Sequence, residues 1–228
     1  MAKKTFFVTG TDTEVGKTFV SVALLQAANA AGLNTMALKP VAAGSTSTPE
    51  GERNEDALEL MQAMSIKMPY AQINPVVFRT PASPHIASAI DNKPTSIDRL
   101  VGFCRGAMMQ SYDFGLIEGA GGWRVPINER ETLAQLPANL DLPVILVVGM
   151  RLGCLNHALL TAEAIRADGL TLAGWIANGI DPDMGYPQEN IQTLKGALRA
   201  PCLGEIPHSS RLESAEPKDF LKINLLLD

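Results

Sequence analysis

Short apolar runs alternate with longer segments of helical hydrophobic spacing along most of the chain. The short runs are rich in β-branched or aromatic residues, which is typical of strands. We expect strands at residues 5–9, 35–41, 114–117, 143–149, 172–177 and 203–206. The segments between them carry apolar residues three or four positions apart, and we expect helices at residues 18–31, 54–64, 96–111, 156–167 and 188–198.

This alternation predicts a doubly wound α/β fold, with a mostly parallel sheet and helices on both faces. Residues 143–149 include almost no polar side chain, as parallel strands covered on both faces tend to do. Residues 44–53, rich in Ser, Thr, Pro and Gly, are predicted to form a mobile loop, and residues 81–84 a second loop. At 228 residues, the chain is expected to be one catalytic domain, residues 1–228.

The strongest local signal lies between the first predicted strand and the first predicted helix. Residues 10–18 read GTDTEVGKT and resemble a phosphate-binding loop, although Thr11 stands where the first glycine is usual. Backbone N–H groups and the helix N-terminus favour phosphate there. We expect Lys17 to be exposed and to reach the β- and γ-phosphates, and Thr18 to bind Mg²⁺. The alternative is a chance Gly-Lys pair at a helix start.

Acidic and basic residues follow other predicted strands. Glu118 ends a buried strand, where open parallel sheets bind ligands, so it is a metal candidate beside Thr18 or else an acid that caps a turn. The glycines at 119–122 would let a backbone approach the substrate closely. Asp56 lies at a helix start, where acids favour the helix dipole, and the residues alone favour that structural role. For Lys39, at the end of the second strand, a site role and no role both stay open.

Two more places in the sequence have groups that can bind a ligand. Residues 153–156 precede a helix whose free N–H groups can bind an anion, although an ordinary helix start explains them equally well. The amide of Asn178 donates and accepts hydrogen bonds, as recognition of adenine requires. Cys154 is expected to be a small buried residue, because no His or Lys partner is indicated.

Composition narrows the class of protein. The net charge of −5 and the lack of a Lys/Arg run give no reason to expect a nucleic-acid partner. The longest apolar run, residues 142–150, is too short to span a bilayer, so we expect no membrane partner. Three separated cysteines without a C-x-x-C pair suit a reducing compartment, and no secretory pattern is visible. We therefore expect a cytoplasmic protein.

Together, these segments resemble the dethiobiotin synthetases, the ATP-dependent carboxylases of biotin synthesis. The resemblance covers nearly the whole chain in order: FVTGTDTEVGKT (7–18), KPVA (39–42), RNEDA (53–57), EGAGGW (118–123), LGCLNH (152–157), GWIAN (174–178) and GEIP (204–207). It implies a P-loop NTPase-like fold, a homodimer and an ATP-dependent cyclo-ligase. The implied reaction converts 7,8-diaminononanoate and CO₂ to dethiobiotin through a carbamate and a carbamic-phosphoric anhydride, releasing ADP and phosphate.

The resemblance also implies roles for individual residues. Lys17 and Lys39 are the implied catalytic cations, and Thr18, Asp56 and Glu118 the implied ligands of Mg²⁺. The implied ATP contacts are Thr13, Glu14, Val15, Gly16, Lys17, Thr18, Phe19, Glu118, Gly119, Asn178, Gly179, Ile206, Pro207 and His208. The implied substrate contacts are Thr11, Lys39 and Gly121 with Gly153, Cys154, Leu155 and Asn156, the last four across the dimer interface.

Two departures and two rivals accompany this interpretation. Ala43 stands where many members of the family have serine, so Ser45 or water could replace that contact, or the contact is dispensable. Residues 179–189 also differ from the family pattern. One rival is another amide-forming or carboxylating ligase of the same broad class with a different acid substrate. The chief rival is an ATP-switched, partner-binding ATPase of the partition or division-site type. Those proteins have a lysine five residues before the P-loop lysine, and here that position is Asp12.

Overall fold

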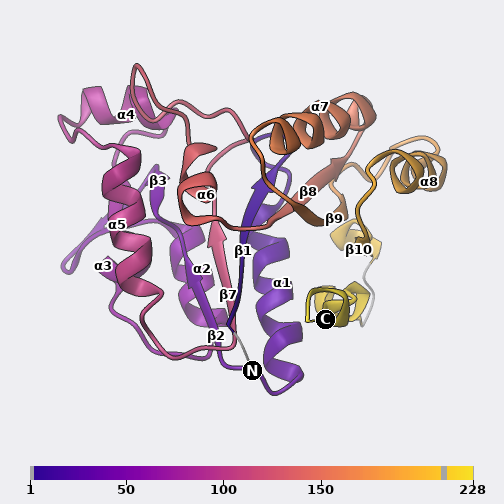
Figure 1. Cartoon of the computed structure of the whole chain (residues 1–228), viewed down its shortest axis with the longest axis horizontal. Coiled ribbons are helices and arrows are strands. Elements are labelled where there is room, and N and C mark those ends of the chain that lie inside the picture. The colour runs from indigo at the N-terminus through magenta and orange to yellow at the C-terminus, as the bar shows by residue number, and fades with distance from the viewer. Residues whose placement is uncertain (1–2, 212–214, 228) are drawn as a thin grey trace.

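The computed structural model describes residues 3–211 and 215–227 and has a central parallel sheet. Within those residues, six strands are hydrogen-bonded in the order β10-β9-β8-β1-β7-β2 (Figure 1). Because every neighbouring pair is parallel, the carboxyl ends of the strands meet at one edge of the sheet. The strands are β1 (Lys4–Gly10), β2 (Thr35–Leu38), β7 (Phe114–Glu118), β8 (Val144–Met150), β9 (Leu172–Gly179) and β10 (Cys202–Ile206).

Helices cover both faces of this sheet, which confirms the predicted doubly wound α/β fold. The connection through α1 (Lys17–Ala30) runs across the sheet in one direction, from β1 to β2. The later connections run in the opposite direction, so right-handed crossovers place their helices on the other face. Those helices are α5 (Ile97–Ala107), α6 (Gln135–Leu140), α7 (Cys154–Ala167) and α8 (Pro187–Ala197). Helix α2 (Glu55–Ala63) packs on α1.

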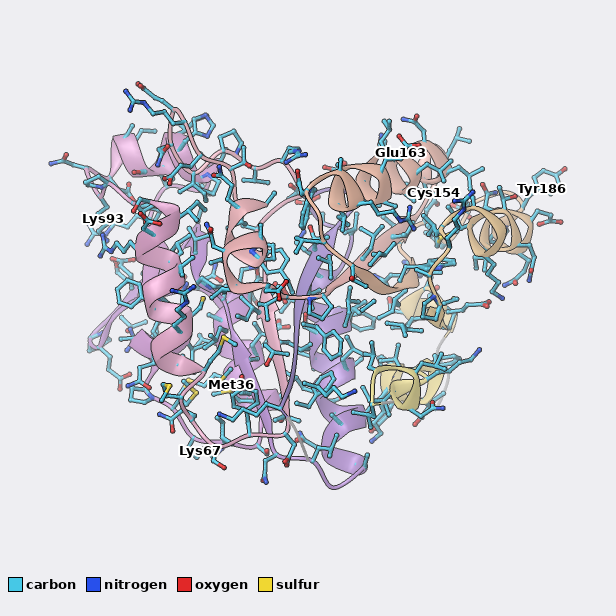
Figure 2. The ribbon with its side chains drawn as sticks, in the orientation of Figure 1. Met36, Lys67, Lys93, Cys154, Glu163 and Tyr186 are labelled. Atoms are coloured by element: carbon cyan, nitrogen blue, oxygen red, sulfur yellow. The ribbon has the colours of Figure 1, made fainter. Side chains whose placement is uncertain are left out.

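The core lies between the sheet and these layers. All seven residues of β8 are buried, as its nearly continuous apolar sequence predicts for a strand covered on both faces. Met36 of β2 lies inside the layers, whereas Lys67 and Lys93 extend from the outside of the molecule (Figure 2). Across the described ranges, none of the helices combines the length and apolar character needed to cross a lipid bilayer.

Two predictions of local structure were wrong. The strand expected at 35–41 ends at Leu38, because Pro40 has no N–H group to continue the ladder. The chain resumes as β3 (Val41–Ala43), which pairs with β6 (Val76–Phe78) in a separate sheet. The loop expected at 44–53 contains an antiparallel hairpin of β4 (Thr46–Thr48) and β5 (Gly51–Arg53).

Several short elements were not predicted. They are α3 (Tyr70–Ile73), α4 (Pro84–Ile90) and the 3₁₀-helices η1 (Ser209–Arg211), η2 (Pro217–Phe220) and η3 (Ile223–Leu226). Each has at most seven residues, too few for a hydrophobic period to show in the sequence.

Candidate functional site

The phosphate-binding loop connects β1 to α1 at the carboxyl edge of the sheet. The Thr11 N–H donates to Val147 O at 3.0 Å, which ties the start of the loop to β8. Glu14 and Gly16 have positive φ angles of 59° and 84°, and Gly16 is the N-cap of α1. In the described chain, no side chain caps this helix, and its first turn has no acidic residue. The N–H groups at the start of α1 therefore suit an anionic ligand.

Lys17 is buried, which corrects the expectation that it is exposed. It is 7% exposed, and its Nζ donates to Asp12 O at 3.0 Å, back across the loop. Burial, reinforced by the neighbouring Lys39, lowers the pKa of Lys17 to about 8. An added negative charge beside this ammonium would favour its protonated form.

Lys39 is held between two carboxylates directly beneath the loop. Its Nζ lies 2.7 Å from Glu118 Oε1 and 2.8 Å from Asp56 Oδ2, and it donates to Gly119 O at 3.1 Å. The Thr18 hydroxyl donates to the same Glu118 Oε1 at 2.8 Å. Residues from β7, α1, α2 and the end of β2 therefore meet at one point, as the sequence predicted for Glu118.

The electrostatics of this cluster favour charged groups. Burial alone lowers the pKa of Lys39, but Glu118 and Asp56 outweigh it and hold that pKa above its usual value. Burial raises the pKa of Asp56, and the nearby Lys39 more than reverses this, so the Asp56 pKa lies below its usual value. The cluster thus keeps an ammonium and a carboxylate ionised in a mostly buried place.

The donor set fits a hard divalent cation. In the part of the chain that the structure describes, no group of three or more His, Cys, Asp or Glu side chains could hold a metal. Two carboxylates and a hydroxyl converge here, however, and Mg²⁺ normally completes its shell with water and phosphate oxygens. Among the described residues, Glu118 Oε2 has no hydrogen-bond partner, although it is buried. The Lys39 ammonium also demonstrates that these carboxylates hold a positive charge.

A buried hydrogen-bond chain supports the cluster, and sequence reasoning missed it. The Tyr70 hydroxyl accepts from the Asn54 N–H at 2.7 Å and donates to Asn74 Oδ1 at 2.8 Å. Asn74 Nδ2 in turn donates to Lys39 O at 2.6 Å. Because Asn54 is the N-cap of α2, the chain links the backbone of Lys39 to the helix that carries Asp56. No sequence spacing signals a contact between residues so far apart.

A cavity of about 1080 Å³ opens over this cluster. Among the predicted site residues, its lining includes Thr13, Glu14, Gly16, Lys17, Thr18, Phe19, Lys39, Asp56 and Gly121. Ala43 and Ser83 line the same cavity, and Ser83 was not predicted. The Ser45 hydroxyl donates to Glu52 Oε2 at 2.6 Å, and Ser45 is not among the residues that line the cavity. The cavity lining does not include Thr11, Glu118 or Gly119, but Glu118 and Gly119 contact Lys39, which lines it.

A second cavity, of about 220 Å³, is mostly apolar. It brings together Gly179, Ile206, Pro207 and His208, all predicted to contact ATP, and adds Met184 and Phe220. Asn178 precedes Gly179 and is buried against the phosphate-binding loop, where its Nδ2 donates to Val15 O at 2.9 Å. Gly16 lines the larger cavity and Gly179 the smaller one, and the hydrogen bond from Asn178 to Val15 connects the residues next to them.

The start of α7 is separate from both cavities. Gly153 caps the helix with a φ of 94°, and no side chain of the described residues caps it. Neither cavity is lined by Gly153, Cys154, Leu155 or Asn156. Leu152 is 95% exposed, whereas Cys154 is buried as predicted and burial raises its pKa. Figure 2 shows Cys154 on the side of the molecule where α7 packs against α8.

Asp12 pairs with an arginine of its own chain. Its Oδ2 lies 2.5 Å from the Arg151 guanidinium, in the loop between β8 and α7. This position therefore carries a negative charge that is already paired within the subunit. The arrangement offers nothing that resembles a lysine reaching across a dimer to a second nucleotide.

Comparisons with curated proteins give long, similar relatives. The chain is 54% identical over 228 residues to the "ATP-dependent dethiobiotin synthetase BioD" of Cellvibrio japonicus, covering 100% of both sequences. It is 49% identical to the "ATP-dependent dethiobiotin synthetase BioD 1" of Escherichia coli, covering 98% of this chain and 99% of that one. Residues 4–216 also match the model of a family described as an AAA domain.

Solved structures resemble the fold at low sequence identity. A ParA family ATPase from Chlorobium tepidum has a TM-score of 0.56 at 12% identity, covering 100% of this chain and 98% of that one. The MinD cell division protein of Aquifex aeolicus has a TM-score of 0.58 at 12% identity, covering 98% and 95%. These likenesses support the P-loop NTPase-like fold and nothing finer.

Proposed function

The chain belongs to the family of ATP-dependent dethiobiotin synthetases, and from this premise we propose which of its residues bind the substrates and promote the reaction. It is an ATP-dependent cyclo-ligase of biotin biosynthesis. Its substrates are 7,8-diaminononanoate, CO₂ and ATP, and its products are dethiobiotin, ADP and phosphate.

The chemistry needs no nucleophile from the protein. One substrate amine adds to CO₂ and loses a proton, which gives a carbamate. A carbamate oxygen then attacks the γ-phosphorus, the bond to ADP breaks, and a carbamic-phosphoric anhydride forms. The second amine attacks the carbonyl carbon and expels phosphate, which closes the cyclic urea. Phosphoryl transfer of this kind depends mainly on positioning and charge stabilisation.

Lys17 and Lys39 provide that charge stabilisation in our proposal. The Lys17 ammonium lies inside the loop whose N–H groups face the phosphate position, so it neutralises charge on the β- and γ-phosphates. Lys39 lies at the floor of the same cavity, where an ammonium stabilises the carbamate and the transferred phosphoryl group. Thr11 and Gly121 contribute backbone contacts to the substrate, and Gly121 lines the cavity.

Mg²⁺ is the metal ion that we propose for this site. Thr18 Oγ1, Asp56 and Glu118 would hold it, because they are hard oxygen donors gathered beside the phosphate-binding loop. When bound, the ion would neutralise charge on the phosphate oxygens of ATP.

The nucleobase is assigned to the smaller cavity. Its apolar lining suits a planar ring, and Asn178 lies beside it with a side-chain amide that can both donate and accept. The residues that line this cavity include Gly179, Ile206, Pro207 and His208. ATP would then lie across Gly16, with its phosphates at Thr13–Phe19 and its base in the smaller cavity.

A homodimer completes the substrate site in this proposal. The diamine's carboxylate lies a flexible alkyl chain away from the reacting amines, and the free N–H groups at Gly153–Asn156 lie outside the cavity of their own chain. Exposed Leu152 and Leu160 on and beside α7 provide an apolar surface for the partner. We treat residues 1–228 as one catalytic domain and place the enzyme in the cytoplasm, which suits its free cysteines.

The partner-binding ATPase is less well supported. Its only support is the fold shared with ParA and MinD at 12% identity, and Asp12 is already paired with Arg151. The observation that carries the ligase assignment is 54% identity over the whole chain, together with the cluster of Lys39, Glu118, Asp56 and Thr18.

Measuring ADP release with and without each co-substrate tests the proposal. A dethiobiotin synthetase should release ADP at an appreciable rate only when both 7,8-diaminononanoate and CO₂ are present. ADP release that is equally fast without the diamine would contradict the ligase function and favour an ATPase.

A further inference from the structure

Val15 is held at the point where the phosphate-binding loop turns into α1. The residue is buried, and Cβ atoms added at Gly10 of β1 and Gly149 of β8 would lie only 2.5 Å and 2.8 Å from its γ-methyl groups. Both positions are glycine, so the Val15 side chain fits between the ends of two adjacent strands. The next strand, β9, contributes the hydrogen bond from Asn178 Nδ2 to Val15 O.

Asn178 also fills the space beside Gly16. A Cβ on Gly16 would lie 2.2 Å from Asn178 Nδ2, and Asn178 itself is only 4% exposed. Gly16 is the N-cap of α1, so its backbone decides where the first N–H groups of that helix point. The side chain of Asn178 therefore contacts the two residues that orient the phosphate-binding N–H groups.

We propose that Asn178 is a positioning residue for the phosphate-binding loop, in addition to its contact with the nucleobase. One N–H of its amide donates to Val15 O, and within the described part of the chain the other N–H and the carbonyl oxygen have no partner and remain for a ligand. The base cavity is lined by both chain neighbours of Asn178, Ala177 and Gly179, so this residue lies between that cavity and the phosphate-binding loop. The base contact rests on the proposed function, whereas the support of the loop rests on contacts within the chain.

Inorganic tripolyphosphate separates the two roles, because it has phosphates and no base. The substitution Asn178→Leu keeps the approximate shape of the side chain and removes its donor, so Val15 O loses a buried partner. We expect Asn178→Leu to bind tripolyphosphate, with Mg²⁺ present, roughly tenfold more weakly than the wild type in calorimetry. Unchanged tripolyphosphate affinity with weakened ATP binding would overturn the proposal, since Asn178 would then contact only the base.

Two further variants separate the loop from the base cavity. Met184→Ala removes a side chain that lines the base cavity and not the cavity over the loop. It should weaken ATP binding and leave tripolyphosphate binding unchanged, which a general loosening of the fold would not do. Asn178→Ala is the second test if Asn178→Leu does not fold, and it should show the same loss. Wild-type affinity for tripolyphosphate in folded Asn178→Ala would equally overturn the proposal.

The wild-type preparation used for calorimetry is also assayed for diamine-dependent ADP release. Loss of tripolyphosphate affinity in the Asn178 variants without diamine-dependent release in the wild type would support the loop role and contradict only the ligase function. Normal release in the wild type with unchanged tripolyphosphate binding in the variants would contradict only the loop role.

Discussion

Lys39 illustrates how this site uses charge at the scale of single residues. Its ammonium is almost completely buried and contacts Glu118 and Asp56, and Glu118 is itself fully buried. A buried charge is tolerated when it is paired and hydrogen-bonded, and removal of one partner leaves a costly uncompensated charge. The cluster is therefore stable only as a set, and the lowered pKa of Asp56 and raised pKa of Lys39 favour their ionised forms before a metal or nucleotide binds.

The lowered pKa of Lys17 predicts proton uptake when ATP binds. At pH 8 about half of the Lys17 side chains are neutral in the free protein, because that pH equals the pKa of about 8. Phosphate charge favours the ammonium and raises this pKa, so binding should take up about half a proton. Calorimetry of ATP binding in buffers of different ionisation enthalpy measures this uptake. Lys17→Arg keeps a permanent charge and should abolish the uptake; equal uptake in both proteins would contradict the prediction.

Asp56→Asn tests the proposed metal ligands. The variant loses a charged oxygen ligand, so the Mg²⁺ concentration that gives half-maximal turnover should rise roughly tenfold. The Asp56 side chain is 44% exposed, whereas that of Glu118 is fully buried. Substitution of Asp56 should therefore destabilise the folded protein less than substitution of Glu118. Glu59→Gln is the matched control, because Glu59 lines the same cavity without a contact to Lys39. A Mg²⁺ requirement equal to that of the control would mean that Asp56 does not bind the metal and only favours the helix dipole at the start of α2.

The sequence predicted the positions and roles of these residues with different success. Glu118 was predictable, because it follows an apolar strand of a parallel sheet and ligands bind at that edge. For Asp56, position alone favoured the helix dipole, and only the family resemblance indicated a metal role. Lys17 was expected to be exposed because it lies in a loop, yet it is buried and its Nζ donates to Asp12 O within that loop.

At the scale of elements, the chain from Asn54 through Tyr70 and Asn74 to Lys39 joins α2 to the end of β2. Tyr70→Phe removes a hydroxyl that both accepts and donates within this chain. We expect a loss of about 1–3 kcal/mol in the free energy of unfolding, since the Asn54 N–H and Asn74 Oδ1 lose a partner. We also expect a lower kcat, because Lys39 and Asp56 lose their common support.

Tyr112→Phe provides a matched control for that prediction. Its hydroxyl makes a 2.9 Å hydrogen bond with Thr5 Oγ1, at the opposite edge of the sheet from the site. It should lose comparable stability in urea unfolding and keep its kcat. An equal effect of the two substitutions on kcat would mean that Tyr70 contributes stability alone.

Long regular elements were predictable and short ones were not. The apolar periods of α1, α7 and β8 are long enough to show in the sequence, and their ends agree with the structure to within two residues. The break at Pro40 was missed because Val41–Ala43 is as β-prone as the strand before it. The hairpin at 46–53 is fully or partly exposed and polar, so no hydrophobic alternation marks its strands.

At the scale of the whole molecule, the proposed dimer predicts complementation between two defective subunits. An active site would use Lys17 of one subunit and Asn156 of the other. Asn156→Ala alone should raise the KM for the diamine and leave ATP affinity nearly unchanged, and Lys17→Ala alone should abolish turnover. Mixing the two variants should restore activity, because a heterodimer has one site with both residues intact. Activity no higher than that of either parent, despite demonstrated subunit exchange, would contradict a site shared between subunits.

The fate of the oxygen atoms of CO₂ tests the central claim most directly. If the chain transfers the γ-phosphoryl group to a carbamate oxygen, that oxygen leaves with phosphate when the ring closes. A reaction started with C¹⁸O₂, and analysed before the label exchanges with water, should give phosphate with one ¹⁸O and dethiobiotin with the other. Mass spectrometry of both products measures this distribution. Phosphate without ¹⁸O, formed at the same rate as dethiobiotin, would contradict transfer to the carbamate and with it the proposed use of this site.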